Sequence, residues 1–267
     1  MYPWAGKWAL VTGASAGIGV ALAAELAAGG TNLVVTARRR DRLEALARDL
    51  SAKHKIRTEI CVADLADPAA PEAIFTFARE KSLQIDLLVN NAGFGAYGEF
   101  AASDRARQVE MVQVNCSAVV NLTHLFLQPM LQRKSGDILI VASTAAFQAV
   151  PYIATYAATK AFDLHFAEGL AEEVKPFGIR VCGLCPGSTE SEFHFVASQA
   201  SAPAAKRPRE TAEKVARVGL QALAAGKTYV ISGRRNYFGA HFQRLATRHF
   251  VTAIAAKLFR PPAKSQT

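Results

Sequence analysis

A tyrosine, a lysine and a serine stand at a spacing that could form one proton-transfer site. Tyr156 and Lys160 are four residues apart, so on a helix they share one face, where an ammonium favours the ionised phenol and lowers its pKa from about 10. Ser143 precedes them on the chain and could hydrogen-bond a substrate oxygen. The Tyr/Lys pair alone is weak evidence, because a chain of this composition has roughly a one-in-four chance of containing it.

A glycine-rich turn near the N-terminus predicts a dinucleotide site. It follows an apolar strand at Trp8–Thr12 and precedes a helix, which is where a βαβ unit receives a pyrophosphate. Missing Cβ atoms let the backbone approach the phosphates, and the helix N-terminus supplies N–H donors. The expected contacts are Gly13, Ser15, Ala16, Gly17, Ile18 and Gly19.

The end of the second strand favours NADP(H) over NAD(H). An NAD-selective site would offer an acid there, but the chain has Ala37 followed by Arg38, Arg39 and Arg40. The Arg38 guanidinium suits a 2'-phosphate, with its arginine neighbours and Ser15 as helpers. The alternative is a solvated helix start, although three cations at a helix N-terminus oppose its macrodipole.

Apolar runs of strand length alternate with helical segments, which predicts an α/β fold of the doubly wound, Rossmann-like kind with a seven-stranded parallel sheet flanked by helices. The expected strands are Trp8–Thr12, Asn32–Ala37, Arg57–Val62, Asp86–Asn90, Asp137–Ala142, Arg180–Leu184 and Thr228–Ile231. The expected helices are Gly17–Ala28, Asp41–Lys53, Pro71–Lys81, Ser103–Gln132, Thr155–Lys175 and Thr211–Ala225.

The 267 residues, 51% of them hydrophobic, fit one catalytic domain over residues 1–235 and an extension over 236–267. We expect a cytoplasmic protein, because the N-terminus lacks an apolar signal region and four scattered cysteines suit a reducing compartment. The cysteine and histidine spacings predict no catalytic metal. The net charge of +9 resides mostly in the tail, so we expect no nucleic-acid partner.

Together these motifs make the chain resemble the short-chain dehydrogenase/reductase family in its compact form. The resemblance rests on Thr12–Gly19, Asp64-Leu65, Asn90–Gly93, Asn115, Ser143, Tyr156–Lys160 and Pro186-Gly187, in the family's order. It implies catalytic roles for Ser143, Tyr156, Lys160 and Asn115, the last holding a water that links Lys160 to solvent. Tyr156 and Lys160 would also contact the cofactor, together with Asp64, Leu65, Asn91, Ala92, Gly93, Pro186, Gly187, Thr189 and Ser191. Ser191 stands where many members have Thr. The family also implies a homodimer or homotetramer.

The expected substrate is a small apolar carbonyl compound or alcohol. The candidate wall is mostly apolar and carries no Lys or Arg: Ser143, Phe94, Tyr97, Ala145, Phe147, Tyr152 and Phe193. Residues Ser198–Arg209, rich in Ala, Ser and Pro, are placed where a lid would lie.

Beyond the last strand, apolar residues recur at three- to five-residue steps among Arg244, Arg248 and Lys257, which predicts an amphipathic basic helix or two short ones. Packing across a subunit interface or over the substrate mouth is the favoured interpretation, and peripheral contact with a membrane is the other. The overall prediction is an NADP-dependent oxidoreductase with Tyr156 as general acid/base. The alternatives are a non-catalytic NADP(H) sensor and a membrane-associated regulatory protein.

Overall fold

The computed structural model describes residues 2–190 and 209–261. The predictions for Ser191, Phe193 and residues 198–208 of the lid segment fall outside these ranges.

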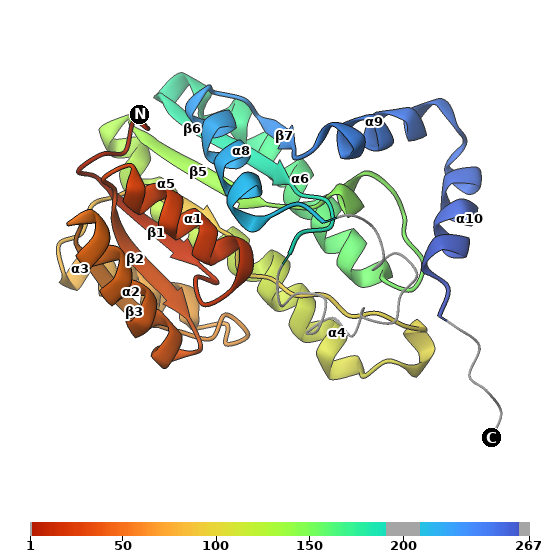
Figure 1. The fold of residues 1–267 in the computed structure, drawn as a ribbon, viewed down its shortest axis with the longest axis horizontal. Helices are drawn as coiled ribbons and strands as arrows, with labels where there is room; N and C mark the ends of the chain where they lie inside the picture. The colour runs from red at the N-terminus through yellow and green to blue at the C-terminus, as the bar shows by residue number, and fades with distance from the viewer. Residues whose placement is uncertain (1, 191–208, 262–267) are drawn as a thin grey trace.

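Seven parallel strands form one sheet in the order β3-β2-β1-β4-β5-β6-β7, which confirms the predicted fold class (Figure 1). Each strand begins and ends within one residue of its predicted bounds. The strands are β1 Trp8–Thr12, β2 Asn32–Ala37, β3 Thr58–Val62, β4 Ile85–Asn90, β5 Gly136–Val141, β6 Ile179–Cys185 and β7 Tyr229–Ile231. The order reverses direction between β1 and β4, the position where open α/β sheets bind ligands at their carboxyl ends.

Helices cover both faces of the sheet because both faces are apolar. Ala9 and Val11 of β1 pack with the helices α1, α2 and α8, while Trp8 and Leu10 pack with α3, α5 and α6 on the other face. The bounds are α1 Gly17–Ala28, α2 Arg40–His54, α3 Ala70–Glu80, α4 Arg105–Val112, α5 Ala118–Arg133, α6 Ala154–Val174 and α8 Ala212–Ala224.

The predicted helix over Ser103–Gln132 is present over residues 105–133, but it is not a regular α-helix throughout. The helix begins at Arg105, after the N-cap Asp104, and a π-helical turn at Gln113–Ser117 separates α4 from α5. Asn115 lies in this turn, fully buried. Such turns insert a residue into the α-helical ladder and often accompany functional sites, so the break gives Asn115 an orientation that a regular helix would not.

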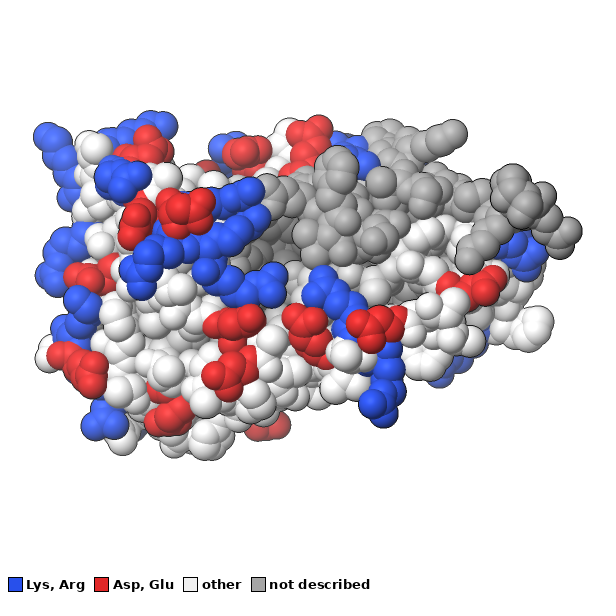
Figure 2. All heavy atoms as spheres, turned by 90° about the horizontal axis from the view of Figure 1, so that it is seen from below, with Lys and Arg blue, Asp and Glu red and all other residues white. Residues whose placement is uncertain are grey.

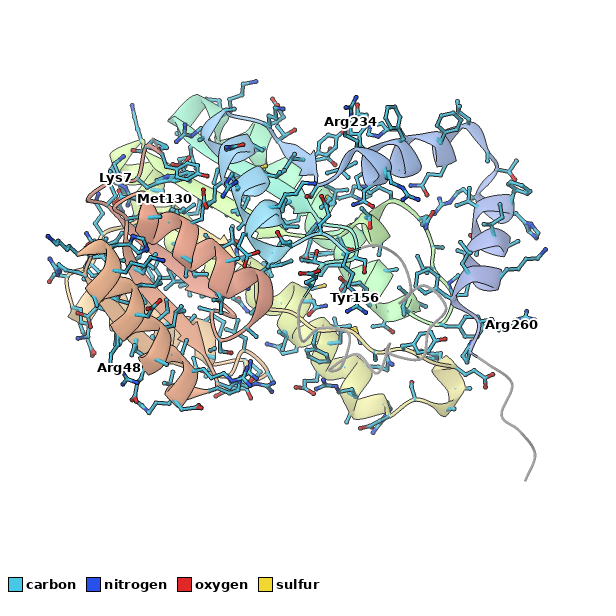
Figure 3. The ribbon with its side chains drawn as sticks, viewed as in Figure 1. Lys7, Arg48, Met130, Tyr156, Arg234 and Arg260 are labelled. Atoms are coloured by element: carbon cyan, nitrogen blue, oxygen red, sulfur yellow. The ribbon has the colours of Figure 1, made fainter. Side chains whose placement is uncertain are left out.

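The C-terminal extension forms two helices joined by a short turn: α9 Arg234–Phe242, a 3₁₀ turn at Gln243–Leu245, and α10 Arg248–Phe259. These helices form an arm beyond β7 (Figure 1), and Figure 3 places Arg234 and Arg260 at its two ends. The predicted boundary between residues 235 and 236 therefore falls inside α9. Among the described residues, no helix is both long and apolar enough to span a bilayer.

The arm has an inner and an outer apolar face. On the inner face Ala255 is buried and Phe259 packs against the main core. On the outer face seven large apolar side chains are at least 42% exposed: Tyr237, Phe238, Phe242, Leu245, Phe250, Ile254 and Leu258. Figure 2 shows the molecule from below. Basic and acidic side chains are interspersed over the described part of the surface in this view.

Candidate active site

The glycine turn packs closely against the segment after β4. Gly13 has φ +67°, and a Cβ built there would lie 2.9 Å from both Ala92 Cα and Asn91 Nδ2. The N-cap residue of α1, Ala16, offers no side-chain hydrogen bond to the first turn of the helix. The N–H groups at the start of α1 are therefore available to an anion, and the residues present fit a dinucleotide pyrophosphate.

Thr12 fixes the turn to the segment after β4. Its hydroxyl accepts hydrogen bonds of 2.9 Å from the backbone N–H groups of Asn91 and Ala92. The Asn91 amide in turn donates to the Thr12 carbonyl at 2.8 Å. Thr12 belongs to the family motif quoted above but is not among the predicted site residues. Its place at the end of the strand, directly before Gly13, is the sequence signal for this role.

The arginines after β2 lie at the mouth of this turn, with Arg39 closer to it than Arg38. Arg39 donates to the Ser15 hydroxyl at 3.0 and 3.2 Å. The Arg38 guanidinium lies 3.8 Å from Asp64 and 4.0 Å from Glu110, and its side chain is 61% exposed. Asp64 is half exposed, so a ligand reaching this edge meets two guanidinium groups, with the carboxylates of Asp64 and Glu110 beside Arg38.

Leu65, predicted beside Asp64 as an adenine contact, is buried in the main core.

Tyr156, Ser143 and Lys160 converge at the carboxyl end of β5. Ser143 follows β5 and hydrogen-bonds the Tyr156 side chain; it also caps the next 3₁₀ turn by accepting from Ala145 N at 3.1 Å. The Lys160 ammonium donates to the Val141 carbonyl at 2.8 Å. Figure 3 shows Tyr156 near the middle of the molecule, inward of the tail helices.

Burial raises the pKa of Tyr156 above its ordinary value, although Lys160 and the hydrogen bond with Ser143 lower it. The predicted net lowering of this pKa is therefore wrong for the described chain, because desolvation of the phenolate outweighs the nearby ammonium. Burial would also lower the pKa of Lys160, but Asp163 and Tyr156 raise it above the ordinary value. Lys160 is thus a cation at neutral pH.

Asp163 is the charged partner that the predicted site lacks. Its carboxylate lies 2.9 Å from the Lys160 ammonium, and both side chains are at most 7% exposed. The sequence signal that could have revealed it is the spacing, because an acid three residues after Lys160 lies on the same helix face.

Asn115 ties the π turn to the segment after β4 and to α6. Its amide oxygen accepts from Phe94 N at 3.1 Å, while its nitrogen donates to the Phe94 carbonyl and to the Thr159 hydroxyl, both at 3.0 Å. A Cβ on Gly93 would lie 3.1 Å from Asn115 Oδ1 and 3.4 Å from Lys160 Nζ. The amide oxygen and nitrogen of Asn115 are thus both used in hydrogen bonds within the protein. Any contact of Asn115 with water would therefore involve its backbone groups.

The segment after β6 lies against the start of the tail. The Pro186 carbonyl accepts from Thr144 N at 2.8 Å, and Thr189 is buried. A Cβ on Gly187 would collide with the side chain of Asn236 on α9. Pro186, Gly187 and Thr189 are therefore held at the carboxyl end of β6, and Asn236 is a neighbour that the sequence did not indicate.

The candidate substrate wall divides into core residues and residues beside the site. Phe94 is buried in the core, with the Arg107 guanidinium 3.8 Å above its ring. Phe147 packs against Tyr229 at 6.4 Å between ring centroids. Tyr97 donates its hydroxyl to the Phe259 carbonyl of α10 at 2.9 Å.

The other two described wall residues are Ala145 and Tyr152. Ala145 packs partly buried against the core. Tyr152 has φ +67°, and its carbonyl accepts from Gly98 N.

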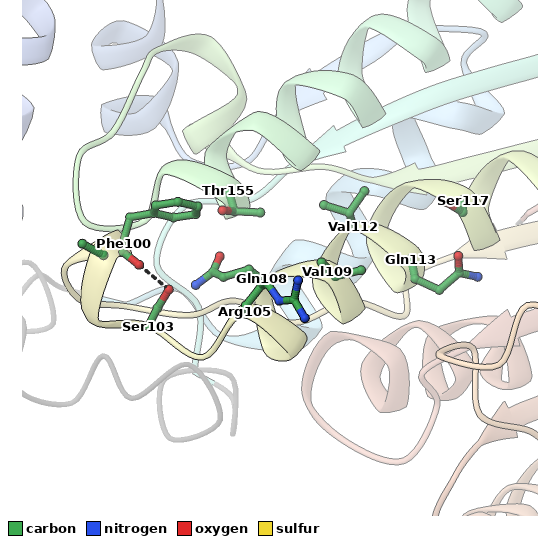
Figure 4. A pocket seen from close by; sticks show the side chains of 10 residues that line it. Phe100, Ser103, Arg105, Gln108, Val109, Val112, Gln113, Ser117 and Thr155 are labelled. Carbon is green, nitrogen blue, oxygen red and sulfur yellow. Dashed lines mark hydrogen bonds between the residues drawn. The ribbon is translucent and has the colours of Figure 1, made fainter.

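A separate apolar groove of about 610 Å³ lies on the outer side of α4 (Figure 4). It is lined by Phe100, Val109 and Val112 among others, and Thr155 at the start of α6 also contributes. Ser143, Tyr156 and Lys160 are absent from this lining. The groove is therefore distinct from the proton-transfer site.

Within the described ranges, no group of three or more His, Cys, Asp or Glu side chains is arranged to hold a metal. The four cysteines are free thiols, and burial raises the pKa of each of them.

Comparison with known proteins agrees with this geometry. The chain is similar to the very-long-chain 3-oxoacyl-CoA reductase of Phaeosphaeria nodorum, with 35% identity over 180 residues, 66% of this chain and 53% of the relative. It is also similar to the human inactive hydroxysteroid dehydrogenase-like protein 1, with 33% identity over 202 residues, 74% of this chain and 58% of the relative. The chain thus spans little more than half the length of these curated relatives.

A solved structure of a short-chain dehydrogenase from Sphingobium yanoikuyae in complex with NADPH superimposes with a TM-score of 0.81 at 26% identity, covering 98% of this chain and all of that one. The profile of the family described as short chain dehydrogenase matches residues 7–201, which include the glycine turn, Ser143, Tyr156 and Lys160. Fold, motifs and profile agree, and the chain belongs to the short-chain dehydrogenase/reductase family of oxidoreductases.

Proposed function

We propose that this protein is an NADP-dependent oxidoreductase that interconverts an apolar ketone or aldehyde and the corresponding alcohol. The observation that carries the proposal is the meeting of Tyr156, Ser143 and Lys160 at the carboxyl end of β5. The nicotinamide, when bound, exchanges the hydride with the substrate carbon. The glycine turn and the arginines after β2 would hold its phosphates.

The chain's own residues handle the proton. During reduction, Ser143 donates a hydrogen bond to the carbonyl oxygen and stabilises its developing negative charge, and Tyr156 transfers its phenolic proton to that oxygen. Lys160 stabilises the phenolate that results. During oxidation, the phenolate of Tyr156 removes the proton of the alcohol.

NADPH oxidation against a panel of apolar ketones, aldehydes and a long-chain 3-oxoacyl thioester tests this function; the fungal relative's name motivates the last member. Replacing Tyr156 by Phe should lower turnover at least about 100-fold while NADPH binding persists. Tyr2→Phe is the matched control, because Tyr2 bonds Glu25 away from the site. Near-normal turnover of Tyr156→Phe would overturn the mechanism.

The second candidate function is a non-catalytic NADP(H) sensor. A human relative is named inactive, which makes this alternative concrete. The chain retains Ser143, Tyr156 and Lys160, and their mutual contacts favour catalysis. NADPH binding without turnover of any panel member would favour the sensor.

The groove beside α4 would accept a second copy of this chain. Phe100, Val109 and Val112 are 42% to 68% exposed there, and Phe162 of α6 is 40% exposed. Apolar patches of this kind mark protein interfaces. Val109→Glu should shift the sedimentation of the protein from dimer or tetramer toward monomer, and a wild-type chain that is already monomeric at micromolar concentration would contradict the proposal.

The outer face of the C-terminal tail, which is the arm formed by α9 and α10, would contact an anionic membrane surface. Its exposed aromatic and aliphatic side chains lie among exposed cations, namely Arg234, Arg235, Arg248, Lys257 and Arg260. The chain has no Asp or Glu after Glu213, so two such tails would repel each other, whereas anionic lipid headgroups would attract both.

A further inference from the structure

Asp163 is an acid in the interior of the site, one helical turn beyond Lys160. Its side chain is 1% exposed, and its Oδ2 lies 2.9 Å from the Lys160 ammonium. Its other oxygen, Oδ1, is buried without a hydrogen-bond partner among the described residues. Burying an ion pair costs several kcal/mol of desolvation for each ion, so a hydrophobic residue would serve packing alone at least as well.

The carboxylate fixes where the Lys160 ammonium lies. A lysine ammonium has three N–H donors. One is directed to Asp163 and another to the Val141 carbonyl at the end of β5, 2.8 Å away. These two acceptors come from the helix and from the sheet, so together they hold the ammonium across the gap between α6 and β5. The third donor remains for Tyr156 or a ligand.

We propose that Asp163 is a positioning residue for proton transfer, whose carboxylate holds Lys160 between α6 and Val141 and offsets part of the positive charge that Tyr156 experiences. This inference rests on the proposed oxidoreductase function, because it assigns Asp163 a role in the same site.

Neighbouring groups leave Asp163 as the principal negative charge near the phenol. Burial raises the pKa of the Asp163 carboxyl, while the adjacent Lys160 ammonium lowers it and favours the carboxylate. Cys116 of the π turn faces the Lys160–Asp163 pair, and burial raises its pKa to about 11. Cys185 of β6 acts on Tyr156 directly, and burial raises its pKa as well. Both thiols are therefore neutral at physiological pH.

The same contacts set the sign of the expected pH effect. The Asp163 charge raises the pKa of Tyr156, against the lowering by Lys160 and Ser143. Removing that charge should therefore lower the pKa of Tyr156, so that the phenolate needed for alcohol oxidation forms at lower pH.

Asp163→Asn tests the proposal, since it keeps the size and one acceptor oxygen but removes the charge. In alcohol oxidation with NADP, the acid limb of its kcat/KM profile should move to lower pH than in wild type. Glu172→Gln is the matched control, because Glu172 is an exposed carboxylate on the same helix, and its profile should superimpose on wild type. The proposal is overturned if the acid limb of a folded Asp163→Asn protein is unchanged or lies at higher pH than that of wild type.

A second measurement separates this inference from the proposed function. The ultraviolet absorbance of phenolate is titrated in Asp163→Asn and in wild type. The titration curve of the same protein carrying Tyr156→Phe is subtracted in each case, which leaves the signal of Tyr156. The Tyr156 midpoint should fall in Asp163→Asn whether or not any substrate turns over, and an equal midpoint in both proteins overturns the role of Asp163. If Asp163→Asn does not fold by circular dichroism, Asp163→Ser, which removes the same charge with a smaller side chain, takes its place.

Discussion

The Tyr97 hydroxyl donates a 2.9 Å hydrogen bond to the backbone carbonyl of Phe259, which joins the segment after β4 to the last residue of α10. The contact spans 162 positions of sequence and fixes the end of the tail beside a candidate substrate residue. The inner face of α10 therefore packs on the body, while its outer face stays exposed.

Tyr97→Phe should loosen the tail without unfolding the body. The change removes one hydrogen bond, worth about 1 kcal/mol, and leaves the ring in place. Amide hydrogen exchange over residues 248–260 should become faster, while exchange over the sheet should not change. Tyr237→Phe is the control, because Tyr237 is 48% exposed on the outer side of α9. Unaltered exchange in α10 would show that the bond does not hold the tail.

Replacing the arginines after β2 should change cofactor preference. Arg38→Ala and Arg39→Ala each remove a donor suited to a 2'-phosphate, so the Kd for NADPH should rise about tenfold or more, with that for NADH nearly constant. Arg48→Ala on the exposed outer side of α2 should leave both values unchanged (Figure 3). Equal binding of NADPH and NADH by the wild-type protein would contradict the preference.

Asn115→Ala should destabilise the protein. The substitution leaves the Phe94 N–H group buried without its acceptor and removes the contact with Thr159, at a cost of about 1–3 kcal/mol in the free energy of unfolding. Urea denaturation followed by circular dichroism measures the loss. Asn121→Ala, at an exposed position of α5, should change the free energy by no more than about 0.5 kcal/mol. Equal effects of the two substitutions would mean that the Asn115 contacts contribute little.

The tail should bind anionic vesicles. Cosedimentation with phosphatidylserine-containing vesicles should exceed that with phosphatidylcholine alone, and it should weaken as salt is added. Leu245→Ser with Phe250→Ser should lower binding, because both side chains are more than half exposed. Phe177→Ser, an exposed phenylalanine outside the tail, is the control.

Deleting residues 236–267 should abolish this binding while circular dichroism shows that the body remains folded. Binding that survives the deletion would exclude the tail as the contact, and no binding by the full chain would favour packing against protein instead.

Local sequence patterns predict the sheet, the glycine turn and the Tyr156/Lys160 pair. Strand alternation, helical periodicity and fixed motif spacing are written in neighbouring residues, and all seven predicted strands appear in the structure. The glycine turn is likewise recognised from neighbouring residues, because an apolar strand, three glycines and a helix follow one another in the sequence.

Tertiary structure decided what depends on residues distant in sequence. Burial, which no local pattern measures, raises the pKa of Tyr156 despite Lys160. The π turn at Asn115 is held by Phe94 and Thr159, so helical periodicity over Ser103–Gln132 could not reveal it. In the sequence, the two faces of α10 are both apolar and cannot be told apart. Packing on the folded body buries the inner face and leaves the outer face exposed. The surroundings of a side chain depend on how the whole chain packs, and this packing places the Asp163 carboxylate beside the Lys160 ammonium.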